Sequence, residues 1–125
     1  MYVLDSSALI ELIERLPKSN DIIRSFEEED STTTSVCVHE VLAGVHSEID
    51  RMVWNTLFSS IEVLQFDVKA AQISSQLQQE LKREGKLINK MDILIAAICK
   101  ASNATLITLD KDFEKIKGLN VKVIK

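Results

Sequence analysis

Short apolar runs alternate with longer amphipathic stretches along the whole chain, and this alternation restricts the fold more than any other feature. The runs expected to form strands are residues 2–4, 31–35, 61–66, 105–109 and 121–124, with helical spacing between most of them. Such alternation predicts a three-layer α/β/α fold with a parallel sheet of about four to five strands. At 125 residues the chain has the length of one domain, residues 1–125, with its own core.

Several helix boundaries can be predicted from capping residues. A first helix should follow Asp5 and run through Leu16, and Ser19 or Asn20 should cap a short second helix that ends in the acidic residues 27–30. Asp67 should begin a long helix that stops at Gly85. Asn89 should cap a helix over residues 90–101, which is apolar on nearly all sides and therefore expected to be deeply buried.

Composition indicates a folded protein rather than a membrane or disordered one. Hydrophobic residues make up 46% of the chain and charged residues 27%, with three glycines and one proline. No apolar run reaches the roughly 18 residues of a membrane helix, and Asp5 interrupts the apolar start, so we expect a cytoplasmic protein. Cys37 and Cys99 lack ligand spacing and are expected to be packed, reduced thiols. The net charge of −4 argues weakly against a nucleic-acid partner, unless bound metal offsets clustered acids.

Four acidic residues are expected at one edge of the sheet. Asp5 and Asp110 are each the first charged residue after a buried strand, and the carboxyl ends of parallel strands form the usual binding crevice. Glu40 lies one turn into the helix after the strand of residues 31–35. Asp92 stands three residues after Asn89, at a helix–helix junction that does not by itself place it at this edge.

Each acid also has a purely structural explanation. Asp5 could cap the helix behind it, Asp110 could cap the turn before Phe113, Asp92 fits a capping box, and Glu40 suits the positive end of its helix. Gathered together, however, the carboxylates would repel one another and their pKa values would rise, a penalty that a divalent cation removes. Ligands that are all oxygen favour Mg²⁺ or Mn²⁺, and such a site suits phosphate chemistry.

Further polar residues surround these acids. The hydroxyls of Ser6, Ser7 and Thr108 could orient carboxylates or water, and Asp112 could share the metal or begin a turn. Basic residues that flank the Asp92 and Asp110 segments could contact RNA phosphates, although solvated helix ends explain them equally well; these are Lys82, Arg83, Lys86, Lys90 and Lys111.

Four stretches resemble, in order, the four motifs of PIN-domain nucleases: LDSSALIEL, SVCVHEVLAG, NKMDILIAA and TLITLDKDF. The resemblance covers essentially the whole chain and points in particular to the small VapC-type toxins of prokaryotic toxin–antitoxin systems. It implies that an Mg²⁺ or Mn²⁺ site for endoribonuclease cleavage of single-stranded RNA is formed by Asp5, Glu40, Asp92 and Asp110. It also implies a homodimer and an antitoxin partner. The chain departs from many relatives in having Ser6-Ser7 where they have Thr-Asn, and Leu109 where they often have arginine or asparagine.

Other functions remain open from the sequence. The main alternative is a non-catalytic α/β module that binds metal or RNA, either a degenerate nuclease fold or a receiver-like domain that binds Mg²⁺ for signalling. A receiver requires a phosphoacceptor aspartate and a distal lysine at spacings not found here. A phosphatase with an aspartyl nucleophile would need a D-x-D motif, but position 7 is serine. A metal-dependent ribonuclease is therefore the favoured prediction.

Overall fold

A five-stranded parallel sheet forms the centre of the computed structural model, which describes residues 1–26 and 30–125. The strand order is β3-β2-β1-β4-β5, and every neighbouring pair is parallel. The strands are β1 (Tyr2–Leu4), β2 (Ser31–Thr34), β3 (Glu62–Leu64), β4 (Thr105–Thr108) and β5 (Val121–Val123). The predicted α/β class and the parallel sheet are confirmed.

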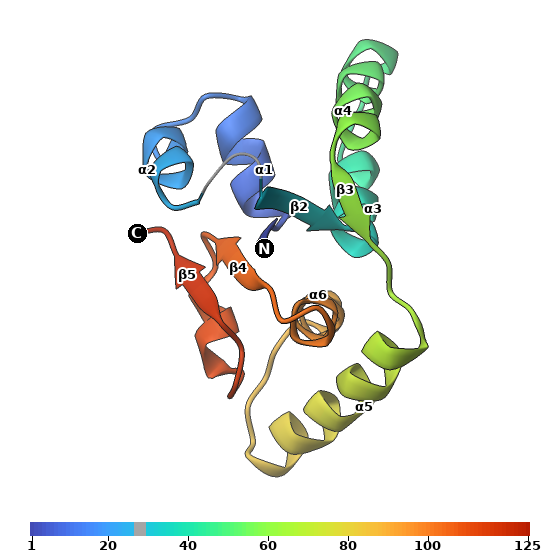
Figure 1. Cartoon of the computed structure of the whole chain (residues 1–125), viewed down its shortest axis with the longest axis vertical. Helices are drawn as coiled ribbons and strands as arrows, with labels where there is room; N and C mark the ends of the chain where they lie inside the picture. The colour runs from blue at the N-terminus through green and yellow to red at the C-terminus, as the bar shows by residue number, and fades with distance from the viewer. Residues whose placement is uncertain (27–29) are drawn as a thin grey trace.

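Helices cover both faces of this sheet. Figure 1 shows α1 and α2 on one side of the strands and α5 and α6 on the other, which gives the three expected layers. The helices are α1 (Ser6–Ile13), α2 (Ser19–Arg24), α3 (Ser35–Ala43), α4 (Glu48–Ser60), α5 (Val68–Arg83) and α6 (Lys90–Ala101), with a short 3₁₀ helix η2 (Lys111–Lys115). None of the helices in the described part of the chain is long and apolar enough to cross a membrane.

The alternation of side chains in the two central strands divides the core in two. Val3 and Leu106, which are partners in the β1–β4 register, pack into a cluster with α5 and α6. Leu4 and Ile107, the next partners, face α1, α2 and α4. β1 and β4 are thus buried on both faces, as is usual for the central strands of a parallel sheet. Cys37 and Cys99 are buried free thiols in the α5–α6 cluster, as predicted.

The same topology brings four segments to the carboxyl edge of the sheet. Asp5 follows β1 directly, Asp110 lies two residues beyond the end of β4, and α3 follows β2 without a gap. The connection from α6 to β4 spans only residues 102–104, so the C-terminus of α6 lies at the amino edge of the sheet. The N-terminus of α6, with Asp92 in its first turn, therefore lies at the carboxyl edge.

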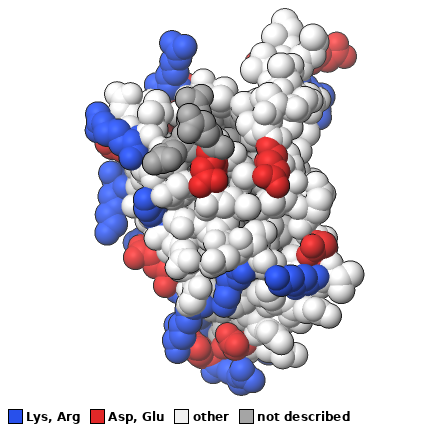
Figure 2. Space-filling view, viewed as in Figure 1, with Lys and Arg blue, Asp and Glu red and all other residues white. Residues whose placement is uncertain are grey.

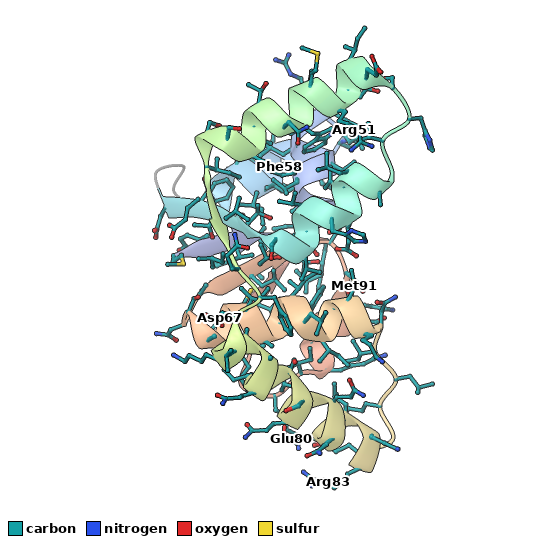
Figure 3. All side chains as sticks on the ribbon, turned by 90° about the vertical axis from the view of Figure 1, so that its right-hand side faces the viewer. Arg51, Phe58, Asp67, Glu80, Arg83 and Met91 are labelled. Carbon is teal, nitrogen blue, oxygen red and sulfur yellow. The ribbon has the colours of Figure 1, made fainter. Side chains whose placement is uncertain are left out.

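The predicted caps of α5 and α6 are confirmed. Ala70 N–H donates to Asp67 Oδ1 over 2.9 Å, and Met91 N–H donates to Asn89 Oδ1 over 2.9 Å. Gly85 has a φ of +67° just beyond α5, a conformation that favours glycine. Figure 3 shows Asp67 and Arg83 at opposite ends of α5 and Met91 at the start of α6.

Three local predictions were wrong. Helix α1 stops at Ile13, because Arg15 adopts a φ of +53°, and Leu16 lies outside the helix and is exposed. The N-cap position of α2 is Lys18 rather than Ser19 or Asn20. The turn predicted at residues 112–113 is part of η2. The predicted acidic end of the second helix lies, except for Asp30, outside the described residues.

Candidate metal centre

Asp5 is a buried carboxylate that three donors hold in place. Ala8 N–H and the Ser7 hydroxyl donate to Oδ1 over 3.0 and 2.6 Å, and the Thr108 hydroxyl donates to Oδ2 over 2.5 Å. Burial raises the pKa of Asp5, the three hydrogen bonds oppose that rise, and the negative charge of Asp110 adds to it. Asp5 is thus the N-cap of α1, one of the two roles considered for it from the sequence. The hydrogen bond from Thr108 also connects it to the end of β4.

Glu40 approaches the same region from α3. The Ser6 hydroxyl donates to Glu40 Oε1 over 3.2 Å and so links the first turn of α1 to α3. Burial raises the pKa of Glu40, the Ser6 bond and the neighbouring His39 lower it, and the charge of Asp5 raises it. His39 itself is exposed.

Asp110 and Asp112 form the start of η2. Asp112 N–H donates to Asp110 Oδ1 over 2.9 Å, so Asp110 caps this short helix. The carboxylate of Asp112 forms an ion pair with Lys115 at 3.1 Å and is about 43% exposed. Asp112 thus lies in the first turn of η2, and the other role that the sequence left open for it, sharing the metal, stays a prediction.

Asp92 is the acid whose environment has no simple structural explanation. It is partly buried, and no hydrogen bond or ion pair reaches its carboxylate from the residues that the structure describes. Its pKa is raised to about 6, chiefly by burial and then by the negative charges of Asp110, Glu40, Asp5 and Asp112. The structure thus brings all four predicted acids into one region, including the one that the sequence placed least firmly.

The donor set fits a hard divalent cation, although the acids do not converge on one point. Among the described residues, no three Asp, Glu, His or Cys side chains are close enough to form a ready coordination group. The four carboxylates instead lie close enough for the charges of Asp5, Glu40 and Asp110 to act on Asp92, and each has acceptor positions beyond its present hydrogen bonds. Their mutual repulsion is the penalty that a bound Mg²⁺ or Mn²⁺ would remove.

The predicted basic residues fall into two groups. Lys86 forms an ion pair with Glu84 at 2.9 Å and donates to the Lys115 carbonyl over 3.5 Å, so it holds the α5–α6 connection against η2. The remaining basic residues are exposed and form no ion pair within the described part of the chain: Lys82, Arg83, Lys90 and Lys111. On the face shown in Figure 2, basic and acidic side chains are interspersed.

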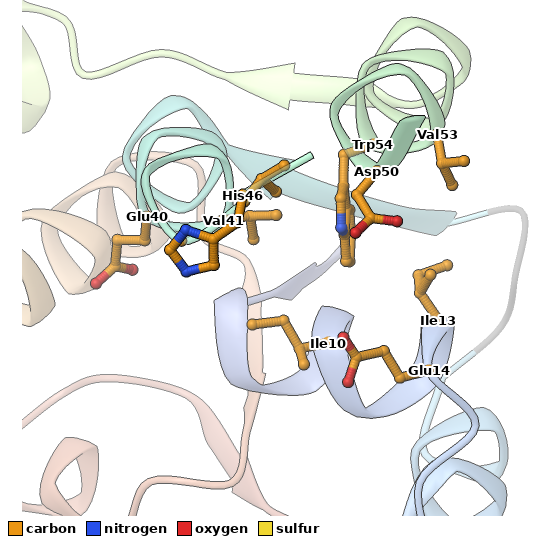
Figure 4. A pocket seen from close by; sticks show the side chains of 11 residues that line it. Ile10, Ile13, Glu14, Glu40, Val41, His46, Asp50, Val53 and Trp54 are labelled. Atoms are coloured by element: carbon orange, nitrogen blue, oxygen red, sulfur yellow. The ribbon is translucent and has the colours of Figure 1, made fainter. Parts of the chain in front are cut away.

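A groove of about 390 Å³ between α1 and the α3–α4 pair was not predicted from the sequence. Apolar side chains such as Ile13, Val53 and Trp54 line it, and Glu40 lies at its margin together with Glu14 and Asp50 (Figure 4). The sequence did contain a signal. Helix α4 carries apolar residues on more than one side, because Trp54 is buried against Phe58 whereas Val53 is 53% exposed.

The family model described as "PIN domain" matches residues 2–119. The chain belongs to the PIN domain family. This PIN domain is 28% identical over 126 residues to Ribonuclease VapC2 of Rickettsia felis, in an alignment that covers 95% of the chain and 94% of the relative. It is 25% identical to the tRNA(fMet)-specific endonuclease VapC of Shigella flexneri, covering 97% and 96%.

Solved structures agree with this assignment. The PIN domain superposes on a chain of VapBC2 from Rickettsia felis, whose structure was solved bound to a DNA fragment from its promoter. The TM-score is 0.84 and the sequence identity is 25%, and the match covers 99% of this chain and 98% of that chain. It superposes on a chain of DNA-bound VapBC from Salmonella typhimurium with a TM-score of 0.87 and 23% identity, at 99% and 98% coverage. The second likeness supports the fold alone.

Proposed function

We propose that this PIN domain is a metal-dependent endoribonuclease that hydrolyses phosphodiester bonds of single-stranded RNA, and that it is the toxin of a toxin–antitoxin pair. The observation that carries the proposal is that acids from four separate segments, Asp5, Glu40, Asp92 and Asp110, meet at the carboxyl edge of the sheet. Burial and the neighbouring acids raise the pKa of Asp92 to about 6, as expected where carboxylates gather at a site suited to a cation. The names of the relatives, ribonuclease and endonuclease VapC, support the same reaction class.

Asp5, Glu40, Asp92 and Asp110 would hold the ion, for which we propose Mg²⁺ or Mn²⁺. When bound, such an ion polarises a phosphoryl oxygen and lowers the pKa of a bound water. The residues of the chain provide the rest. Ser7 and Thr108 fix Asp5, and Ser6 fixes Glu40. Because burial and neighbouring acids raise the pKa of Asp92 to about 6, metal binding below about that pH should release a proton.

The test is an RNA cleavage assay with Mn²⁺ and the Asp5→Asn variant. The asparagine carbonyl can still accept from Ala8, so we expect the fold to persist. We expect cleavage to fall by more than about 100-fold, because loss of a group that merely supports a metal ligand costs about 10–100-fold. Asp21→Asn, which changes an exposed acid on α2, is the matched control.

Undiminished cleavage by Asp5→Asn, or cleavage that survives EDTA, would contradict the mechanism. Metal binding without cleavage by the wild type would favour the non-catalytic module.

We also propose that the groove between α1 and the α3–α4 pair binds the antitoxin. Its apolar lining and its three acids, Glu14, Glu40 and Asp50, suit a segment with apolar side chains and an arginine or lysine. A segment bound there would reach Glu40 and so obstruct the acidic site. The complexes solved for VapBC proteins support an antitoxin partner.

The groove can be tested with the protein encoded immediately upstream. Val53→Glu should weaken its binding by about 10-fold or more, since a charge would replace an apolar side chain in the groove. Val68→Glu, on α5 and 74% exposed, should leave binding unchanged. Equal effects of the two variants would place the interface elsewhere. The homodimer stays a prediction, which sedimentation of the purified protein would test.

A further inference from the structure

Two hydroxyls hold Asp5 in a symmetrical arrangement. Ser7 Oγ donates to Oδ1 over 2.6 Å, and Thr108 Oγ1 donates to Oδ2 over 2.5 Å. Each hydroxyl also accepts from one of two successive N–H groups beyond β4. Leu109 N–H donates to Ser7 Oγ over 3.1 Å, and Asp110 N–H donates to Thr108 Oγ1 over 3.0 Å.

The available protons determine the direction of these bonds. A serine or threonine hydroxyl has one proton to donate. Both protons go to Asp5, so the 3.4 Å contact between Ser7 Oγ and Thr108 Oγ1 adds little. With Ala8 N–H as the third donor, both oxygens of Asp5 are oriented by fixed groups.

Ser7 and Thr108 join the same two segments from opposite sides. Thr108 lies beside Asp110 and donates to Asp5, 103 positions earlier, whereas Ser7 lies beside Asp5 in the first turn of α1 and accepts from a residue 102 positions later. Ser7 therefore connects the Asp5 turn with the backbone that leads into Asp110. Loss of its hydroxyl would leave Leu109 N–H without its acceptor and Asp5 Oδ1 with one donor fewer.

We propose that Ser7 is a positioning residue for metal binding: through its hydroxyl it orients the Asp5 carboxylate and sets its place relative to Asp110. The inference rests on the proposed function, which makes these two acids metal ligands. Ser7 does not itself contact the ion. It acts on both ligands at once, through a donated bond to one and an accepted bond from the residue before the other.

The test compares Ser7→Ala with Ser7→Thr in the full-length chain. Mn²⁺ affinity is measured by calorimetry, and kcat and KM are measured for RNA cleavage. Ser7→Ala should weaken Mn²⁺ binding by about 10–100-fold and lower kcat with little change in KM for RNA. Ser7→Thr, which keeps the hydroxyl, should restore both quantities to within about threefold of the wild type. If Ser7→Ala does not fold, Ser7→Cys, with its weaker donor, replaces it.

Thr32→Val is the matched control. It removes a buried hydroxyl on β2 that donates to the Tyr2 carbonyl over 3.0 Å and contacts none of the acids. Thr32→Val should lower the melting temperature but leave Mn²⁺ affinity unchanged. If Ser7→Ala likewise lowers only the melting temperature, or if the wild type binds no Mn²⁺, the inference is overturned. If the wild type binds Mn²⁺ with the expected dependence on Ser7 but cleaves no RNA, the nuclease proposal fails and the positioning role stands.

Discussion

At the scale of single residues, the acids combine a structural role with a charge that the chain leaves uncompensated. Asp5 caps α1, Asp110 caps η2 and Glu40 accepts from Ser6. A carboxylate offers about four acceptor positions, so a cap or a single hydrogen bond does not exhaust it. The structural explanation of each acid is therefore compatible with metal binding.

The metal-free protein should become less stable as pH rises from about 4 to about 6. Asp92 has a pKa of about 6 in the folded state, against 3.8 for an ordinary aspartate. Between these values the folded state holds more protons than the unfolded state, so the free energy of unfolding falls with rising pH. Asp92→Asn removes this contribution and should flatten the dependence. Because Asp92 is partly exposed, solvent screening reduces the size of the effect, and its direction is the test.

Urea unfolding at several pH values between about 4 and 7, in EDTA, measures this dependence. Some slope should persist in Asp92→Asn, because burial also raises the pKa values of Asp5 and Glu40. Asp21→Asn should keep the wild-type slope. A slope in Asp92→Asn as steep as in the wild type would show that the charge of Asp92 is compensated in solution.

The position of the candidate site in the fold could be predicted from sequence, but most contacts among its residues could not. An acid directly after a buried strand has its position set by the strand, which is why Asp5 and Asp110 could be placed. The bond from Leu109 to Ser7 joins residues 102 positions apart and depends on the packing of α1 beside β4. Such a contact cannot be predicted from the sequence around either residue.

At the scale of elements, the two glycines that follow α3 and α5 should respond differently to substitution by alanine, because only the one after α5 has a positive φ. Gly85 has a φ of +67°, so Gly85→Ala should lower the free energy of unfolding by about 1 kcal/mol. Gly44 ends α3 with a φ of −92°, and an added Cβ would meet backbone oxygens no closer than 3.7 Å. Gly44→Ala should therefore be neutral or stabilise the protein by up to about 1 kcal/mol. Urea unfolding of both variants measures the difference, and equal effects would contradict the assignment of the α5 terminus.

Alternating elements predict a parallel sheet because each intervening helical segment carries the chain back to the edge where the previous strand began, so that the next strand points the same way. They do not predict the strand order, because each new strand can be added at either edge of the growing sheet.

The groove between α1 and the α3–α4 pair was missed for a related reason. It exists because α4 packs through Trp54 and leaves Val53 facing α1, and only the relative placement of the two helices decides this.

At the scale of the whole molecule, the acidic centre should make folding depend on divalent metal. The net charge is only −4, but four of the negative charges meet where three central strands end. Their separation in sequence means that they come together only in the folded chain. A cation that binds them will therefore favour the folded state over the unfolded one.

Millimolar Mn²⁺ should accordingly raise the melting temperature. At a metal concentration about 100 times the Kd, the stabilisation is about 2.7 kcal/mol, which for a domain of this size corresponds to a shift on the order of 10 °C. EDTA should reverse the shift, and Asp92→Asn should reduce it, because one of four ligands is lost. Asp21→Asn should retain it in full, since its carboxylate lies on α2 beside Arg24 and away from the site. If the shift persists undiminished in Asp92→Asn, Mn²⁺ binds elsewhere on the surface. If the wild type shows no shift, a metal site at the four acids is excluded. The melting curve thus tests the metal centre without an RNA substrate.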